Sequence, residues 1–177
     1  SAATLVIRSM TITGIASTIS ISDTATAYTY TGLAQGPSTS ATSGSTGTVT
    51  YSYQGRLSTT YGPSATKPTN AGTYTVTATV AASGNYAGAS SSSVDFEISK
   101  AALTITSSSH TVTYGDAIPT ITASYAGLVN SESSSVISGQ SCSTTYATSS
   151  SAGTSQTTSC TGGASSNYLI SYVPGAV

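Results

Sequence analysis

Residues 70–80, NAGTYTVTATV, decide the fold class of this chain. After the turn-forming residues Asn, Ala and Gly, the larger side chains Tyr74, Val76 and Val80 alternate with threonines, with Ala78 continuing the period. A period of two predicts a strand with one buried face. Similar runs recur along the chain between Gly, Pro and Asn residues, and none repeats with the spacing of an amphipathic helix. The sequence therefore predicts an all-β protein.

The same stretch opens an internal repeat. NAGTYTVTATVAASGNYAGAS (70–90) resembles SAGTSQTTSCTGGASSNYLIS (151–171): each has Ala-Gly-Thr near its start and Asn-Tyr some residues later. A duplicated pattern of this length indicates two related domains. With strand-like runs at short spacing, each domain is expected to be an immunoglobulin-like β-sandwich, the first at 10–100 and the second at 101–177.

The beginning of the chain resembles the junction between these two domains. VDFEISKAALTIT (94–106) runs from a last strand through Lys100 into a first strand, and TLVIRSMTIT (4–13) has the same plan, with Arg8 in place of Lys100. Residues 1–9 are therefore expected to be a strand and linker that belong to a preceding domain. The second domain, by contrast, is expected to lack its last strand.

A sandwich without an edge strand leaves backbone N–H and C=O groups unpaired, and an added strand can satisfy them. Two arrangements meet this need. Either the repeat continues covalently in a longer tandem, or the segment around Leu5, Val6 and Ile7 completes the second domain of a neighbouring copy. Folding back onto the same chain is disfavoured, because the segment would have to cross the entire first domain.

The composition is nearly uncharged. Only 5% of the residues are charged, the formal net charge is −1, and roughly two residues in five are Ser or Thr. Serine-rich chains are often disordered, but here the hydroxyl residues alternate with apolar ones as in strands. The low charge disfavours nucleic-acid partners, and no apolar run approaches the roughly 20 residues of a membrane span. We expect no membrane insertion.

The two cysteines predict a disulfide. Cys142 and Cys160 are symmetric about residue 151, within the turn-like SSSAG at 149–153. Antiparallel strands that fold back there place the two residues opposite each other, close enough to bridge. A disulfide indicates an extracellular location. The alternatives are free thiols or half of a metal site, and with one His and no CxxC pair we expect no metal.

The second half resembles the MBG family of bacterial immunoglobulin-like repeats. The motifs that carry the resemblance are Tyr114-Gly115-Asp116 with Pro119, Gly127-Leu128-Val129-Asn130, and Asn167-Tyr168. The first half is similar to a companion type from the same arrays. The resemblance implies a secreted or cell-surface protein in which such modules form stalks or adhesins. It implies no catalytic residue and no cofactor.

Residue chemistry does not indicate an enzyme. Nucleophilic catalysis needs a base beside the nucleophile, and His110 is on an alternating run with no acidic residue nearer than Asp116. Asp95 and Glu97 alternate with apolar residues, so they mark the solvent face of a strand rather than a glycosidase pair.

Several residues have predicted structural roles. Asp116 is expected to cap the turn after Tyr114 and Gly115 by bonding the backbone two residues on, with Gly115 at positive φ. The pairs Asn85-Tyr86 and Asn167-Tyr168 resemble a tyrosine corner, in which the phenol packs in the core and its hydroxyl holds a loop backbone.

Four tyrosines are candidates for ligand or lateral contacts. Tyr28, Tyr30, Tyr51 and Tyr53 alternate within two strand-like runs and are expected to be exposed. Such ladders either stabilise cross-strand pairs or stack on sugar rings.

Together these observations predict a structural protein: a repeat unit of an extracellular fibre, stalk or adhesin whose partner is another copy, joined head to tail. The alternative is a carbohydrate-binding module that contacts surface glycans through the tyrosine ladders.

Overall fold

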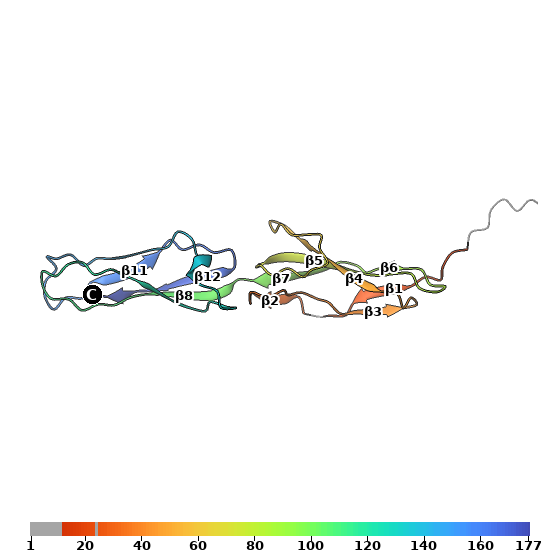
Figure 1. Cartoon of the computed structure of the whole chain (residues 1–177), viewed down its shortest axis with the longest axis horizontal. Coiled ribbons are helices and arrows are strands. Elements are labelled where there is room, and N and C mark those ends of the chain that lie inside the picture. Colours follow the sequence, from red (N-terminus) through yellow and green to blue (C-terminus); the bar gives the residue numbers. More distant parts are fainter. Residues whose placement is uncertain (1–11, 24) are drawn as a thin grey trace, which may run out of the picture. The chain divides into compact units, whose positions relative to one another are not determined.

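The computed structural model describes residues 12–23 and 25–177, and Figure 1 labels most of its strands. The described residues form thirteen strands and one 3-10 turn, Ser134–Val136. They contain no α-helix, which confirms the all-β class. Leu5, Val6 and Ile7 lie outside the described residues.

The chain divides into two compact units. Unit 1 contains the described parts of 1–26, 36–67 and 73–96, and unit 2 contains 27–35, 68–72 and 97–177. Segments 27–35 and 68–72 come from the sequence of the predicted first domain but belong to unit 2. The boundary at residue 100 remains a prediction about the sequence repeat.

Unit 1 is built from antiparallel pairs. β1 (Thr18–Ile21) pairs with β3 (Ser40–Ser43), and β4 (Val49–Gly55) pairs with β5 (Gly72–Val80). β5 also has β6 (Ala89–Ser90) and β7 (Val94–Ser99) as neighbours. Alternate residues of β5 are buried, because the period-two pattern places them all on one face.

Unit 2 contains two three-stranded sheets. The first has the order β12-β8-β9 and the second the order β10-β11-β13. Their bounds are β8 (Ala101–Ser107), β9 (Ala123–Ala126), β10 (Ser141–Thr144), β11 (Thr157–Thr161), β12 (Tyr168–Val173) and β13 (Gly175–Ala176). β2 (Ala27–Thr29) pairs in parallel with residues 97–99 at the end of β7. Alternate residues of β8 are buried, as its AALTITS pattern requires.

The two Asn-Tyr pairs of the repeat begin equivalent parallel pairings. In unit 1 the Ile15 amide donates to the Asn85 carbonyl over 2.8 Å, and in unit 2 the Ala101 amide donates to the Asn167 carbonyl over 3.0 Å. In unit 1 the pairing is an isolated bridge, whereas in unit 2 it continues as the six-residue ladder of β12 on β8. The sequence repeat therefore appears as a repeat of local structure.

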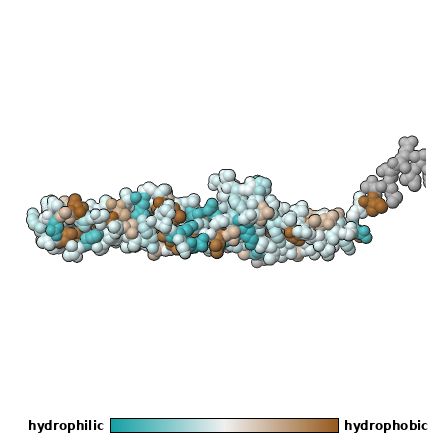
Figure 2. All heavy atoms as spheres, viewed as in Figure 1, coloured by the Kyte–Doolittle hydropathy of each residue, from teal (hydrophilic) through white to brown (hydrophobic). Residues whose placement is uncertain are grey.

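Figure 2 shows the surface that this composition produces. On the visible face most described residues are pale, the colour of intermediate hydropathy, and the brown apolar residues are scattered among them. Hydroxyl side chains, rather than charged ones, therefore provide most of the contact with water.

Candidate functional site

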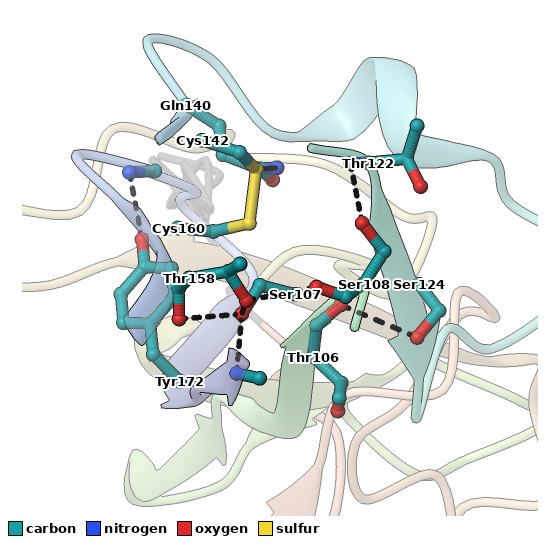
Figure 3. The surroundings of a disulfide bond; sticks show 12 residues. Thr106, Ser107, Ser108, Thr122, Ser124, Gln140, Cys142, Thr158, Cys160 and Tyr172 are labelled. Atoms are coloured by element: carbon teal, nitrogen blue, oxygen red, sulfur yellow. Dashed lines mark hydrogen bonds between the residues drawn. A yellow bond between two sulfur atoms is a disulfide. The ribbon is translucent and has the colours of Figure 1, made fainter. Parts of the chain in front are cut away.

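The disulfide lies in the sheet β10-β11-β13. Cys142 and Cys160 are directly paired in the antiparallel register of β10 and β11, with their Cα atoms 4.0 Å apart and a covalent bond between their sulfurs. Figure 3 shows the bond crossing from one strand to the other. The predicted disulfide is confirmed, and it fixes the hairpin that carries β11.

A buried hydroxyl network lies beside the disulfide (Figure 3). The Ser107 hydroxyl donates to the Thr158 carbonyl over 3.0 Å, and the Thr158 hydroxyl donates to the Ser108 carbonyl over 2.8 Å. The Gly175 amide donates to the Ser107 hydroxyl over 2.9 Å, which ties the start of β13 to β8. Sequence reasoning missed this network, because Ser and Thr are so abundant that none of them stands out.

β13 continues this network along the edge of β11. Gly175 pairs with Thr158 and Ala176 with Thr157. Beyond them, Gln156 and Val177 exchange amide-to-carbonyl bonds of 3.0 and 2.8 Å. On its other side β13 is held by the His110 amide, which donates to the Ala176 carbonyl over 2.9 Å.

A pocket of about 230 Å³ opens beside this edge, within unit 2. We call it the edge pocket; its lining residues are His110–Tyr114, Tyr146, Ser150–Thr154, Gln156 and Val177. The lining residues include no Asp, Glu, Lys or Arg. Two aromatic rings and several aliphatic groups are therefore set among hydroxyls.

Two turns and one tyrosine shape the walls of the edge pocket. In the first turn the Thr113 amide donates to the Asp116 carboxylate over 2.7 Å, and the Asp116 amide returns a bond to the Thr113 carbonyl. In the second, the Ala147 amide donates to the Ser150 hydroxyl over 3.1 Å. Tyr146 is 6% exposed, and its hydroxyl donates to the Asp116 carbonyl over 3.0 Å, so it links the two turns.

The Tyr-Gly-Asp turn differs in one detail from its prediction. Gly115 has a φ of 86°, a conformation that favours glycine. The Asp116 carboxylate, however, bonds the amide three residues earlier instead of the backbone two residues on. Asp116 therefore closes the turn from its end, which leaves Tyr114 67% exposed at the rim of the pocket.

Comparison with known protein families identifies this part of the chain. The family model of the MBG domain (YGX type) matches residues 103–177. Residues 103–177 therefore match the MBG domain, and this name is used below for that region. MBG domains are repeat modules of surface proteins and form a non-enzymatic family, and the disulfide is consistent with an extracellular location. No curated protein and no solved structure is significantly similar to the chain.

In the MBG domain, Tyr168 connects a strand to a loop. It is 2% exposed; the Val129 amide donates to its hydroxyl over 2.9 Å, and the hydroxyl donates to Glu132. The corresponding expectation for Tyr86 in unit 1 is wrong. Tyr86 is 39% exposed, and its backbone, rather than its phenol, holds the loop through bonds with Ser83. Among the described residues of unit 1, the parallel pairing at Tyr86 is a single isolated bridge.

Glu132 accepts hydrogen bonds from two phenols of unit 2. Tyr30 donates to one carboxylate oxygen over 2.5 Å and Tyr168 to the other, and the two rings meet edge to face with centroids 5.5 Å apart. Burial, followed by the hydrogen bond to Glu132, raises the pKa of Tyr30 to about 12. The same two causes raise the pKa of Tyr168. The neutral phenols are therefore the stable form.

The expectation of exposed tyrosine ladders is wrong for Tyr30 and Tyr53. They are 4% and 1% exposed, and Tyr28 and Tyr51 are half-buried. The inward face of β4 carries Tyr51 and Tyr53, whose rings stack with centroids 6.5 Å apart. These rings belong to the packing of each unit, so the structure does not offer them as a platform for sugars.

The remaining chemistry-bearing side chains are dispersed. His110 lies outside the strands, and its Nε2 atom is 2.9 Å from the Ser108 hydroxyl. Among residues 12–23 and 25–177, no three His, Cys, Asp or Glu side chains are grouped so that they could hold a metal ion. In the same part of the chain, no helix has the length and apolar character needed to cross a bilayer.

Proposed function

We propose that the chain is a structural repeat unit of an extracellular bacterial fibre or cell-surface stalk, in which successive units join head to tail. The MBG domain at 103–177 supports a repeat module of a surface protein, and the disulfide supports an oxidising location.

The observation that carries the proposal is the repeat of sequence and local structure within the chain. β5 begins within an Ala-Gly-Thr sequence and β11 follows one, and each is the middle strand between two neighbours in its sheet. Each half also has an Asn-Tyr pair at which a parallel pairing begins. Modules repeated in this way can be joined by a strand added to a sheet edge, which supplies backbone hydrogen bonds and covers apolar surface.

The source of that strand is a segment like the beginning of this chain. TLVIRSMTIT (4–13) matches the plan of VDFEISKAALTIT (94–106), which contains β7 and β8. The segment around Leu5, Val6 and Ile7 of the next copy can supply it, either as a separate subunit or as the following part of a covalent tandem. Both routes give the same head-to-tail contact.

Strand addition suits a load-bearing connection. A strand held along its length by several backbone hydrogen bonds resists extension through all of them together, and the Cys142–Cys160 disulfide keeps the accepting hairpin closed. The formal net charge of −1 allows neighbouring fibres to lie side by side without strong repulsion.

The test compares the native and the denatured particle. We expect the purified chain to form assemblies far larger than one subunit, measured by light scattering and electron microscopy under native conditions. After boiling in denaturant with reductant, separate subunits migrate near 17.4 kDa, and a covalent tandem migrates as a much larger species. A chain that stays monomeric in native buffer at every concentration and remains small after denaturation contradicts the proposal.

A further inference from the structure

We propose that the MBG domain has a selective docking site for the module that precedes it in sequence. The site, which we call the socket, consists of Asn130, Glu132, Asn167 and Tyr168. It holds two segments from before residue 100, 27–35 and 68–72, which we call the docking segments; unit 2 contains both. The inference goes beyond the proposed fibre and does not depend on association between copies, because the socket and the docking segments belong to one chain.

The docking segments are bonded to each other and to the strand residues that lead into the MBG domain. The Gln35 amide donates to the Pro68 carbonyl over 2.9 Å, which joins the two segments. β2, in the first segment, pairs in parallel with residues 97–99, and the Tyr30 amide donates to the Ser99 carbonyl over 2.8 Å. The two segments therefore form one partner for the socket.

Glu132 selects a partner that has a hydroxyl group. One oxygen of its carboxylate accepts from Tyr168, which belongs to the MBG domain itself, and the other accepts from Tyr30. Both tyrosines are almost fully buried, so a polar group that loses its partner here costs free energy. Phenylalanine at position 30 could keep the edge-to-face contact with Tyr168, but Glu132 would lose this donor.

Asn130 selects a partner that has no side chain at position 32. Its Nδ2 atom donates to the Gly32 carbonyl over 3.2 Å. A Cβ atom at position 32 would lie 2.6 Å from the Cβ atom of Asn130, much closer than non-bonded carbon atoms approach. Rotation of the Asn130 side chain cannot relieve this contact, because its Cβ atom is bonded directly to the backbone.

The backbone of the socket has an unusual conformation at Asn130 and Ser131. Their φ values are 52° and 59°, in the left-handed region that residues other than glycine seldom adopt. The two residues on either side of the Ser131 backbone, Asn130 and Glu132, both bond the first docking segment. Such conformations persist where the surrounding structure holds them, and they are frequent at binding sites.

Asn167 contacts the second docking segment with both ends of its side-chain amide. Its Oδ1 atom accepts from the Ala71 amide over 3.0 Å, and its Nδ2 atom donates to the Asn70 Oδ1 atom over 3.1 Å. Its backbone carbonyl accepts from the Ala101 amide, at the start of β8. Asn167 therefore ties the second docking segment to the point where β12 begins to pair with β8.

Together these contacts define the partner that the socket accepts. A module fits when it presents Tyr-x-Gly in the first docking segment and Asn-Ala in the second, here Tyr30-Thr31-Gly32 and Asn70-Ala71. A side chain at the glycine position clashes, and loss of the hydroxyl removes a donor to the carboxylate, so other modules are disfavoured. The socket thus determines which kind of module can precede an MBG domain.

The first experiment compares two glycine substitutions in the full chain. Gly32→Ala and Gly115→Ala both place a side chain at a positive φ, 75° and 86°, but no atom lies within 4 Å of a Cβ added at position 115. Hydrogen exchange measured by NMR reports docking through the Ala71 amide, whose acceptor is the Asn167 side chain. We expect Gly32→Ala to exchange this amide about tenfold faster than Gly115→Ala, while the amides of β8 and β12 keep their protection.

The double variant Gly32→Ala/Asn130→Gly is the rescue. It removes the atom that the new Cβ would meet, and glycine adopts a φ of 52° without strain. We expect exchange of the Ala71 amide to slow by at least about threefold relative to Gly32→Ala. If Gly32→Ala alone does not fold, recovery of a folded chain in the double variant supports the same contact, and failure of both variants contradicts it.

The second experiment observes the first docking segment directly. The rings of Tyr30 and Tyr168 have centroids 5.5 Å apart, so a nuclear Overhauser effect connects their protons when the segment is docked. We expect this signal in the wild type and in Gly115→Ala, and its loss in Gly32→Ala. Loss of the ring contact without faster exchange at Ala71 contradicts the docking of both segments as one partner.

The outcomes separate this inference from the proposed function. Wild-type exchange at Ala71 and an intact contact between the rings of Tyr30 and Tyr168 in Gly32→Ala would overturn the selective socket. Equal acceleration in Gly32→Ala and Gly115→Ala would also overturn it, because backbone strain would then explain the effect. Assembly of copies is measured separately by light scattering, so neither result decides the fibre proposal.

Discussion

At the scale of single residues, the carboxylate of Glu132 accepts hydrogen bonds from two phenols of unit 2. Tyr30 and Tyr168 are both almost fully buried, so each needs a hydrogen-bond acceptor inside the protein. Glu132 supplies one oxygen to each, and this arrangement joins segment 27–35 to the loop that contains Val129 and Glu132. A charged acceptor shared by two buried donors makes this part of unit 2 sensitive to alkaline pH.

We predict that the stability of unit 2 falls at high pH. The folded pKa of Tyr30, about 12, lies above its ordinary value of 10.0. A raised pKa of an acid means that its stabilising contribution is complete below about pH 10 and is lost as the pH rises through about 12. Urea unfolding followed by circular dichroism from pH 7 to pH 12 should therefore show a plateau and then a decline.

The variant Tyr30→Phe is the check on this prediction. It should destabilise the protein by about 1.5–3 kcal/mol at neutral pH, where it removes a hydrogen bond to a charged group, and should make the alkaline decline shallower. Tyr114→Phe, at a tyrosine that is largely exposed, is the matched control. An alkaline decline equally steep in both variants would contradict the assignment to Tyr30.

At the scale of elements, the disulfide and the buried hydroxyl network hold the hairpin β10-β11 and place β13 on it. Cys142 and Cys160 are 18 residues apart in sequence, and a crosslink over such a loop removes entropy from the unfolded chain. The pairing of β4 with β5 has no such crosslink, although it spans seven residue pairs where β10 and β11 share four. The disulfide is thus in β10-β11, the strand pair with fewer paired residues.

We predict that the double variant Cys142→Ala/Cys160→Ala loses about 3 kcal/mol of unfolding free energy, the chain-entropy value for a loop of this length. Hydrogen exchange should locate the loss: amides of β10, β11 and β13 exchange faster, and amides of β4 and β5 serve as the internal control. Equal acceleration in both pairs of strands would show that the disulfide does not act on the hairpin.

At the scale of the whole molecule, the chain has very few charges that could guide the proposed association of copies. The chain has four basic and five acidic residues, and the exposed pair Arg56–Asp95 already neutralises one of each. In the proposed assembly, contacts between copies would then depend on backbone hydrogen bonds and apolar side chains, which salt screens very little.

We predict that assembly is nearly independent of ionic strength. Between about 0.01 M and 1 M salt, where the Debye length falls from roughly 30 to 3 Å, the concentration needed for assembly should change by less than about threefold. Light scattering at a series of sodium chloride concentrations measures this. Disassembly that steepens with added salt would indicate that ion pairs, rather than strand addition, join the copies.

Much of the fold was predictable, because it depends on local periodicity. The alternation in β5 and β8 follows from side chains pointing to opposite faces of a strand, and the symmetry of Cys142 and Cys160 about residue 151 gave the correct pairing. Neither inference needs information about distant parts of the chain.

The burial of the tyrosines was not predictable in the same way. Period two places Tyr28 with Tyr30 and Tyr51 with Tyr53, but it does not say which face of the strand meets the core. Because Ser and Thr occupy both faces of the strands in this chain, the sequence pattern does not show clearly which face is buried. Tyr86 and Tyr168 likewise each follow an asparagine, but the pairing continues along β12 after Tyr168, whereas the pairing at Tyr86 is a single isolated bridge.

The sequence by itself determined the all-β class, the repeat, the disulfide and the match to the MBG domain. Each of these depends only on the spacing of apolar residues, cysteines and motif residues along the chain. The tertiary structure alone decided which tyrosines are buried, the hydroxyl network of Ser107 and Thr158, and the position of the edge pocket beside β11. These features depend on contacts between residues that are far apart in sequence, such as those of Ser107 with Thr158 and Gly175. A local sequence pattern does not predict such contacts.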